Sequence, residues 1–395
     1  MPRPLLAFAL AALSFAVTAP TQFAVGHHDV AWPNLSGQGT PLLAARVCYP
    51  STTGGSSAPI EPNPIGWPVI VFLHGYSLIG SDYGELGAAF AAKGFAVVML
   101  DTAQWNYVDQ AYDGIAAFAA LSVANRDTGT FFAGAFDTRR IAIAGHSMGA
   151  GTMGLVLASN PGYRCGYALA PVSPGVGPAA QIQVPFGMMV GTGDSITPWA
   201  VFSQPYYQAV APTTGLKFWW LMDNTCDHMN IVGFSGATDP AFTRAMDVGI
   251  GFFRHFLDID PAGLERCLGP AAFASPRLVK LTHQVVQPRV WAASRLAIGR
   301  TVRFSMTSEV GPAGILAAQS TSGETQTSLG ILLLDPASTF TWTSGFTVRE
   351  GRLDVWLTVP NNVSLVGYKV ALQALGNTPS NQIQLGSAAE FIVGS

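Results

Sequence analysis

Residues 145–149 are the feature of this sequence that most constrains its fold. They read Gly-His-Ser-Met-Gly and lie between an apolar run at residues 141–144 and a stretch of small residues that favours a helix. A G-x-S-x-G turn of this kind joins a strand of an α/β sheet to a helix and lifts the serine hydroxyl above the sheet. Glycines are needed because the turn is so sharp that bulk two positions either side of the serine would clash. We therefore expect Ser147 at the tip of a strand in a mostly parallel sheet.

The order of the expected elements supports such a sheet. Strands are predicted at residues 44–49, 69–73, 94–100, 141–144, 166–169, 185–190 and 217–222, and helices at 86–93, 113–125, 148–159 and 240–257. Strands that alternate with helices at this spacing indicate a mostly parallel sheet with helices on both faces.

The last third of the chain has a different pattern. From about residue 283 onward, short segments rich in Val, Ile, Thr, Phe and Trp alternate with turn residues, and no helical pattern follows. This is typical of an all-β sandwich. We therefore divide the chain into a leader at residues 1–19, an α/β catalytic domain at 25–270 and a β-sandwich accessory domain at 281–395.

Residues 1–19 have the features of a secretory signal peptide. Arg3 precedes an apolar run at residues 5–17, which is followed by small residues. The run is shorter than the ~20 residues that a membrane helix needs, so we expect no membrane span. We predict that the protein is secreted, or located at the cell surface or in the periplasm.

The charge of the chain argues against a nucleic-acid partner. Only 11% of the residues are charged, and the net charge is −3. Binding to nucleic acid depends on clustered Lys and Arg side chains, which this sequence lacks. The sequence does not indicate an oligomeric state.

The chain contains four cysteines, which suggests disulfides in an exported protein. We favour a Cys226–Cys267 bond, because Cys226 falls in a loop and Cys267 just past a helix, both late in the catalytic domain. Cys48 and Cys165 lie in apolar strands and are equally compatible with buried free thiols.

A serine nucleophile needs a nearby base that accepts its hydroxyl proton. The chain has seven histidines, and His228 lies in the loop after the strand predicted at residues 217–222. In α/β hydrolases the order along the chain is Ser, acid, His. Because His228 lies where this order requires it, we take it as the expected base.

The acid should follow the strand between the serine and the histidine. That strand is predicted at residues 185–190, and Asp194 lies in the turn after it. Asp223 and Asp227 are closer to His228 in sequence, but residues so near rarely reach Nδ1 of the ring. Asp194 is therefore the expected acid, with Asp223 in reserve and Asp227 as a solvated loop residue.

Two backbone N–H groups must also face the oxyanion that develops during acyl transfer. Met148 supplies one, because it follows the nucleophile at the start of a helix. Tyr76 supplies the other, since it follows Gly75 in the loop after the strand at residues 69–73. No His, Cys or carboxylate cluster has the spacing of a zinc site, so we expect neither metal nor cofactor.

These motifs together resemble a known family. The segments 74–76, 145–149 and 194–198, with His228, are similar to the bacterial cutinase and polyester-hydrolase branch of the α/β-hydrolase superfamily, near the dienelactone hydrolases. The resemblance covers about residues 25–269.

The resemblance implies a fold and a set of roles. The fold is the α/β-hydrolase fold, and the roles of nucleophile, acid and base fall to Ser147, Asp194 and His228. The resemblance also implies that Tyr76 forms one wall of the acyl or aryl subsite.

The sequence departs from that family at the opposite wall of the subsite. Polyester hydrolases usually have a tryptophan there, whereas this chain has Val172. Trp105 and Trp199 are candidates to replace it, and His146, beside the nucleophile, is a further candidate substrate contact. Residues 171–184 are too few for a helical lid, so we expect an open cleft suited to bulky or polymeric esters.

We therefore predict a secreted serine carboxylic-ester hydrolase that acts through an acyl-enzyme on an ester substrate. Within enzymes, the alternative is a lipase or an acyl amidase. Outside enzymes, the alternative is a surface adhesion protein on a hydrolase scaffold.

Overall fold

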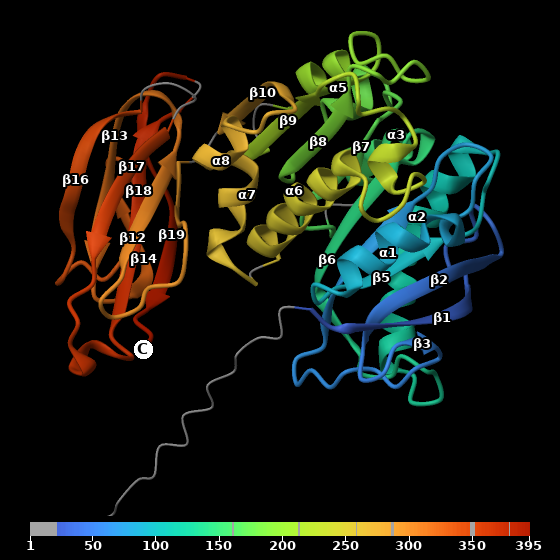
Figure 1. Cartoon of the computed structure of the whole chain (residues 1–395), viewed down its shortest axis with the longest axis horizontal. Coiled ribbons are helices and arrows are strands. Elements are labelled where there is room, and N and C mark those ends of the chain that lie inside the picture. Colours follow the sequence, from blue (N-terminus) through green and yellow to red (C-terminus); the bar gives the residue numbers. More distant parts are fainter. Residues whose placement is uncertain are drawn as a thin grey trace, which may run out of the picture.

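The computed structural model describes residues 22–159, 162–211, 214–257, 259–285, 288–347, 352–378 and 380–395. The predicted leader at residues 1–19 lies outside these ranges. Figure 1 shows an α/β part and, beside it, a second part built of strands, with the short helices α7 (Leu264–Leu268) and α8 (Pro270–Phe273) near the junction.

A ten-stranded sheet forms the α/β part, in the order β10-β9-β8-β7-β6-β4-β5-β2-β1-β3. Its strands are β1 (Ala24–Pro33), β2 (Leu42–Ser51), β3 (Gly55–Ser56), β4 (Trp67–Leu73), β5 (Ala96–Leu100), β6 (Phe136–His146), β7 (Gly166–Leu169), β8 (Phe186–Gly191), β9 (Leu216–Met222) and β10 (Leu278–Val285). The strands from β5 through β4 and β6 to β9 pair in parallel. The carboxyl ends of these strands therefore meet at one edge of the sheet, where ligands bind in open α/β folds.

Helices cover both faces of the sheet (Figure 1). Apolar side chains of α1 (Gly84–Ala91) and α6 (Pro240–Phe256) share one core cluster, and those of α2 (Tyr107–Arg126), α3 (Met148–Ser159) and α5 (Ser203–Ala209) share the other. Every residue of β4 is buried, as expected for a strand covered on both faces. Within the described ranges, no helix is both long and apolar enough to cross a membrane.

Helix α2 begins earlier than the sequence predicted. Its N-cap is Asn106, whose side chain accepts hydrogen bonds from the backbone N–H groups of Val108 and Asp109. An Asn cap satisfies donors that the first helical turn leaves without an intrahelical partner. The helix therefore starts at Tyr107, shortly after Trp105.

The strand-rich part contains two main sheets and a hairpin. The sheets have the orders β11-β12-β17 and β16-β13-β18-β19, and β14 pairs with β15. The strands are β11 (Arg289–Ala292), β12 (Thr301–Thr307), β13 (Glu309–Ala318), β14 (Thr321–Thr327), β15 (Gly330–Leu334), β16 (Phe340–Thr347), β17 (Arg352–Thr358), β18 (Lys369–Asn377) and β19 (Ile383–Ile392). Apolar side chains of both sheets form one core, so the predicted fold class, an α/β-hydrolase fold with a C-terminal β-sandwich, is confirmed.

The two parts join at a place that differs from the boundary drawn from the sequence at residue 281. β10 pairs antiparallel with β9, so residues 278–285 belong to the central sheet. The next strand, β11, carries Trp291, which is buried in the core of the α/β part. Its indole Nε1–H donates to Glu265 of α7 at 3.0 Å, and Glu265 also pairs with Arg303 of β12. The β-sandwich therefore packs directly against α7.

The predicted Cys226–Cys267 disulfide is wrong for this structure, in which all four cysteines are free and buried. The Cys267 thiol instead donates to the carbonyl oxygen of Val248 in α6, 3.3 Å away. Burial raises the pKa of Cys226, and likewise that of Cys48, to about 12. Only the thiolate is reactive, so these two thiols act as small packing groups.

Candidate active site

The turn between β6 and α3 has the shape that its glycines predict. A Cβ atom on Gly145 would lie 2.3 Å from the carbonyl oxygen of Gly149, and one on Gly149 would lie 2.1 Å from that of Leu73. Ser147 itself has a φ of +54°, in the left-handed region that non-glycine residues seldom adopt. This strained backbone presents the serine at the carboxyl end of β6.

The predicted acid and base meet in the structure. Nδ1 of His228 lies 2.8 Å from Oδ2 of Asp194, and both side chains are buried. Because a carboxylate can only accept a hydrogen bond, Nδ1 must carry a proton. In the neutral ring the other nitrogen, Nε2, then holds the lone pair that a base needs.

A full set of donors holds the Asp194 carboxylate. Oδ1 accepts from the backbone N–H groups of Ile196 at 2.9 Å and of Thr197 at 2.8 Å. Burial by itself would raise the pKa of Asp194, but the hydrogen bonds from His228 and Thr197 outweigh it and lower the pKa below its ordinary value. The acid is therefore ionised at neutral pH.

Thr197 is a residue of the site to which the sequence assigned no role. Its hydroxyl oxygen lies 2.7 Å from Oδ2 of Asp194, 3.1 Å from Nδ1 of His228 and 3.1 Å from the carbonyl oxygen of Ala170. A hydroxyl residue three positions after the expected acid was the available signal, because Thr side chains often bond within a turn. Thr197 thus links the acid, the base and the segment after β7.

The two acids nearer to His228 in sequence have local roles. Asp223 accepts hydrogen bonds from the backbone and hydroxyl of Thr225. Asp227 accepts from the backbone N–H groups of Met229 and Asn230. Both carboxylates therefore stabilise turns of their own loop, as Asx turns do.

His146 does not take the substrate-contacting place that we expected for it. The residue is only 1% exposed, and its ring nitrogens bond to Tyr83 and to the backbone carbonyl of His228. The ring is therefore buried and closed to a ligand in solution. Its bond to the backbone of His228 brings the loop of the base against the turn that carries Ser147.

The loop after β4 lies against the same turn. A Cβ atom on Gly75 would lie 3.4 Å from Cβ of Ser147, so this loop passes directly beside the nucleophile. Tyr76 follows Gly75, and Met148 is the first residue of α3, a position whose backbone N–H has no acceptor within the helix. The two expected oxyanion donors therefore belong to segments that flank Ser147.

A buried amide supports that loop. The side-chain amide of Gln110 in α2 donates to the carbonyl oxygen of His74 at 3.0 Å and accepts from the hydroxyl of Thr152 in α3 at 2.6 Å. Gln110 was not among the residues predicted from the sequence. A polar residue on the buried face of a helix was its signal, since buried amides are kept where they satisfy other polar groups.

The expected aromatic contacts separate into two kinds. Tyr76 and Trp105 are 59% and 60% exposed, and their rings meet edge to face with centroids 5.1 Å apart. Trp199 instead packs against Trp219, with centroids 5.7 Å apart, at the margin of the core. Tyr76 and Trp105 therefore form an accessible aromatic corner, whereas Trp199 is engaged in packing.

The segment between β7 and β8 contains one short helix, α4 (Val176–Ala179). A helix of four residues is about one turn long and cannot cover the site as a helical lid would. The structure of this segment agrees with the prediction that residues 171–184 are too few to form a helical lid.

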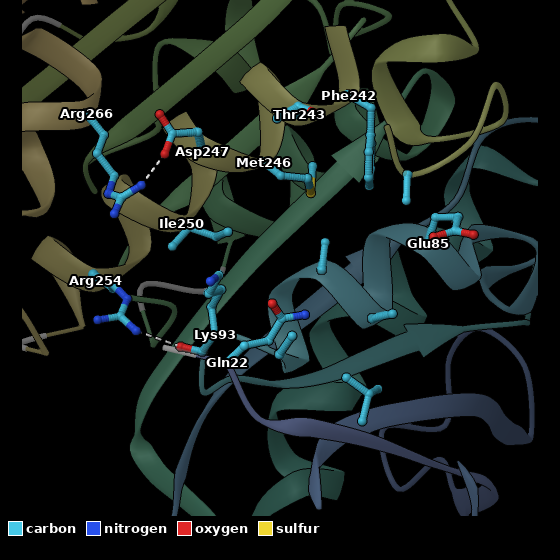
Figure 2. A pocket seen from close by; sticks show the side chains of 15 residues that line it. Gln22, Glu85, Lys93, Phe242, Thr243, Met246, Asp247, Ile250, Arg254 and Arg266 are labelled. Atoms are coloured by element: carbon cyan, nitrogen blue, oxygen red, sulfur yellow. Dashed lines mark hydrogen bonds and ion pairs between the residues drawn. The ribbon is translucent and has the colours of Figure 1, made fainter. Parts of the chain in front are cut away.

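A groove of about 750 Å³ elsewhere on the α/β part lies between α1 and α6 (Figure 2). Two arginines that line it have partners, because Arg266 pairs with Asp247 and Arg254 donates to the carbonyl oxygen of Lys93. None of the residues that line it belongs to the predicted site. The groove is therefore separate from the candidate active site.

Residues 12–265 match the model of a family described as PET hydrolase-like. Over 164 residues the chain is 27% identical to cutinase est1 of Thermobifida alba, a stretch that covers 40% of this chain and 51% of that protein. The chain thus spans about half the length of this curated relative.

Proposed function

The chain belongs to the PET hydrolase-like family, and we propose that it is a serine carboxylic-ester hydrolase that acts through an acyl-enzyme. The observation that carries this proposal is the buried pair of Asp194 and His228, joined at 2.8 Å beside the turn that presents Ser147. The match of the family model across the α/β part supports it.

In the proposed reaction, Nε2 of His228 takes the hydroxyl proton of Ser147 as the serine oxygen attacks the ester carbonyl. The ionised Asp194 stabilises the imidazolium that forms. The backbone N–H groups of Tyr76 and Met148 stabilise the oxyanion of the tetrahedral intermediate. The imidazolium then protonates the departing alcohol, and water hydrolyses the acyl-enzyme by the same steps with His228 again as the base.

We propose bulky or polymeric esters as the substrates. The exposed corner of Tyr76 and Trp105 supports this assignment, because exposed aromatic rings offer large apolar contact area at the rim of a site. The short segment between β7 and β8 supports it as well, since a long chain has to lie across the site rather than enter a closed pocket.

The central experiment compares Ser147→Ala with the parent protein on p-nitrophenyl esters and in labelling by a fluorophosphonate probe. We expect the substitution to abolish labelling and to reduce turnover by about 10³-fold or more, because it removes the nucleophile. Ser159→Ala is the matched control, since it changes a serine at the far end of the same helix. Turnover that survives in Ser147→Ala would refute the proposed nucleophile.

Substrate class is tested with a panel that contains soluble esters, an insoluble polyester, emulsified triglyceride and anilides. A lipase favours the triglyceride and an amidase cleaves the anilides, whereas a polyesterase releases acid from the film. A parent protein that neither labels nor hydrolyses any ester, yet binds the film, is instead the adhesion protein.

Export is part of the proposal, on the strength of the apolar run at residues 5–17. Fractionation of the native host and N-terminal sequencing of the mature protein test it. A protein retained in the cytoplasm with Met1 in place would contradict it.

A further inference from the structure

A chain of hydrogen bonds runs beneath the candidate site. The backbone N–H of Gly75 donates to the hydroxyl of Tyr83 at 2.8 Å. The same hydroxyl lies 2.8 Å from Nδ1 of His146, and Nε2 of His146 lies 2.9 Å from the carbonyl oxygen of His228. The chain of bonds thus connects the oxyanion loop, the turn of the nucleophile and the loop of the base.

The direction of each bond follows from the chemistry of its ends. The carbonyl oxygen of His228 can only accept, so Nε2 of His146 must carry a proton. Burial, the largest cause, lowers the pKa of His146 to about 3, which keeps the ring neutral and leaves a lone pair on Nδ1. The Tyr83 hydroxyl then donates to Nδ1 while it accepts from Gly75. Every donor in this chain of bonds therefore has one acceptor, and the arrangement allows one tautomer of His146.

Packing fixes the members of this network. Tyr83 is only 1% exposed, and its ring contacts Phe72 with centroids 4.8 Å apart and Phe234 at 5.4 Å. The ring of His146 lies 4.7 Å from the ring of His228. Because the rings are held on several sides, the hydroxyl and the two nitrogens have fixed positions rather than a choice of partners.

We propose that Tyr83 is a positioning residue. It holds the oxyanion loop directly at Gly75 and the base loop through His146, and so keeps both loops in register with Ser147. This inference rests on the proposed ester hydrolysis. Small displacements of a donor or a base from the reacting atoms reduce the rate, so a bond network that fixes both loops contributes to kcat. Tyr83 touches no reacting atom in this proposal, because it acts on the backbone at Gly75 and on His146.

The test is Tyr83→Phe in the full chain, which keeps the packed ring and removes the hydroxyl. We expect kcat on p-nitrophenyl butyrate to fall about tenfold, with KM changed less than about twofold. This is below the ~10²–10³-fold loss on deleting an oxyanion donor outright. The inhibition constant of a boronic acid, which mimics the tetrahedral intermediate, should rise by the same factor as kcat falls.

Tyr49→Phe is the matched control. It removes another buried hydroxyl, which donates to the carbonyl oxygen of Ala58 at 2.8 Å in a different part of the sheet. We expect it to leave kcat and boronate inhibition unchanged. If Tyr49→Phe reproduces the losses of Tyr83→Phe, the effect is general destabilisation and the inference is wrong.

A second variant, His146→Gln, tests whether Tyr83 acts through the imidazole. Because the bond to Gly75 stays in His146→Gln, action partly through His146 predicts that Tyr83→Phe loses less activity in that background than in the parent, whereas independent roles predict additive losses. Parental kcat and boronate inhibition in Tyr83→Phe, or additive losses in the double variant, would overturn the inference. A parent protein without ester turnover would instead overturn the proposed function.

Discussion

The proposed reacting groups of the candidate site and its aromatic corner are built in opposite ways. Ser147, Asp194 and His228 are at most 8% exposed, and several hydrogen bonds hold the acid and the base. Tyr76 and Trp105 are well over half exposed and contact each other edge to face. A buried polar group that loses its partner carries a large penalty, whereas an exposed ring can be removed with little loss of stability. The first region should therefore tolerate almost no change, and the second should tune substrate preference.

Asp194→Asn should give the largest effect on the buried side of this contrast. Oδ1 faces two backbone N–H donors, so the amide oxygen of Asn takes that position and its NH₂ group faces Nδ1 of His228. Nδ1 then has to accept, which puts the ring proton on Nε2 and removes the base. We expect kcat on p-nitrophenyl butyrate to fall by about 10³–10⁴-fold.

Asp223→Asn is the control for this substitution, because the Asp223 carboxylate bonds to Thr225 within its own turn. A loss of less than about tenfold in Asp194→Asn would contradict the assignment of Asp194 as the acid, since orienting acids contribute far more.

His146→Gln should reveal the energetic cost of burying the imidazole. Folding lowers the pKa of His146 from 6.5 to about 3, so below pH 6.5 the unfolded chain takes up a proton that the folded protein does not bind. Above pH 6.5 the titration of this ring therefore does not change the free energy of unfolding. As the pH falls from 6.5 toward 3, it lowers the free energy of unfolding progressively. The slope is at most about 1.4 kcal/mol per pH unit.

Urea unfolding of the parent and of His146→Gln across this pH range measures the difference. We expect the free energy of unfolding of the variant to fall less steeply with acid than that of the parent. His28→Gln, at an exposed bond to Ser57, serves as the control. Parallel pH profiles for the parent and His146→Gln would show that the buried ring does not titrate as inferred.

Thr197→Val should give an intermediate effect on the buried side. The substitution keeps the shape but removes the hydroxyl that lies 2.7 Å from Oδ2 of Asp194. Hydrogen bonds to charged groups are stronger than neutral ones, and we expect kcat to fall about tenfold with KM little changed. Thr197→Ser should retain most of the activity. A Thr197→Val variant as active as the parent would show that the hydroxyl of Thr197 does not contribute to kcat.

Trp105→Ala should give the smallest effect, confined to substrate preference. An aromatic contact is worth about 0.5–1.5 kcal/mol, so kcat/KM for aryl esters relative to acetate should fall about threefold to tenfold. The free energy of unfolding should change by less than about 0.5 kcal/mol. Trp199→Ala is the contrasting variant, because its ring packs on Trp219 and its loss should lower stability. An unchanged preference in Trp105→Ala would mean that the corner does not contact substrate.

Much of this fold could be predicted because its signals are local. Gly145 and Gly149 occupy two positions of the turn at which a Cβ atom would clash with the backbone. The continuous apolar run of β4 indicates a strand with helices on both faces of its sheet. The order of Ser147, Asp194 and His228 along the chain follows from the order of parallel strands whose ends meet at one edge. These signals occur along the sequence in a fixed order, so they can be found without coordinates.

Other features could not be predicted, because they depend on which side chains meet. The thiol of Cys267 faces α6 rather than Cys226, and His146 points beneath the site rather than into it. Tyr83 and Thr197 lie in separate segments and enter the site only through packing. The residue types can be read from the chain, but the distances between them cannot.

Backbone sterics and strand periodicity act over a few residues, so the chain alone indicates the class of fold. The same local signals predict the proposed nucleophile and the order of its proposed partners. The pairing of buried donors with their acceptors, in contrast, follows from how the segments pack in three dimensions. In this protein Asp194 bonds to His228, and the hydroxyl of Thr197 lies within hydrogen-bond distance of both. His146 bonds to the backbone carbonyl of His228. Those pairings depend on close packing, in which a polar group must find its partner among neighbours that are remote in the chain.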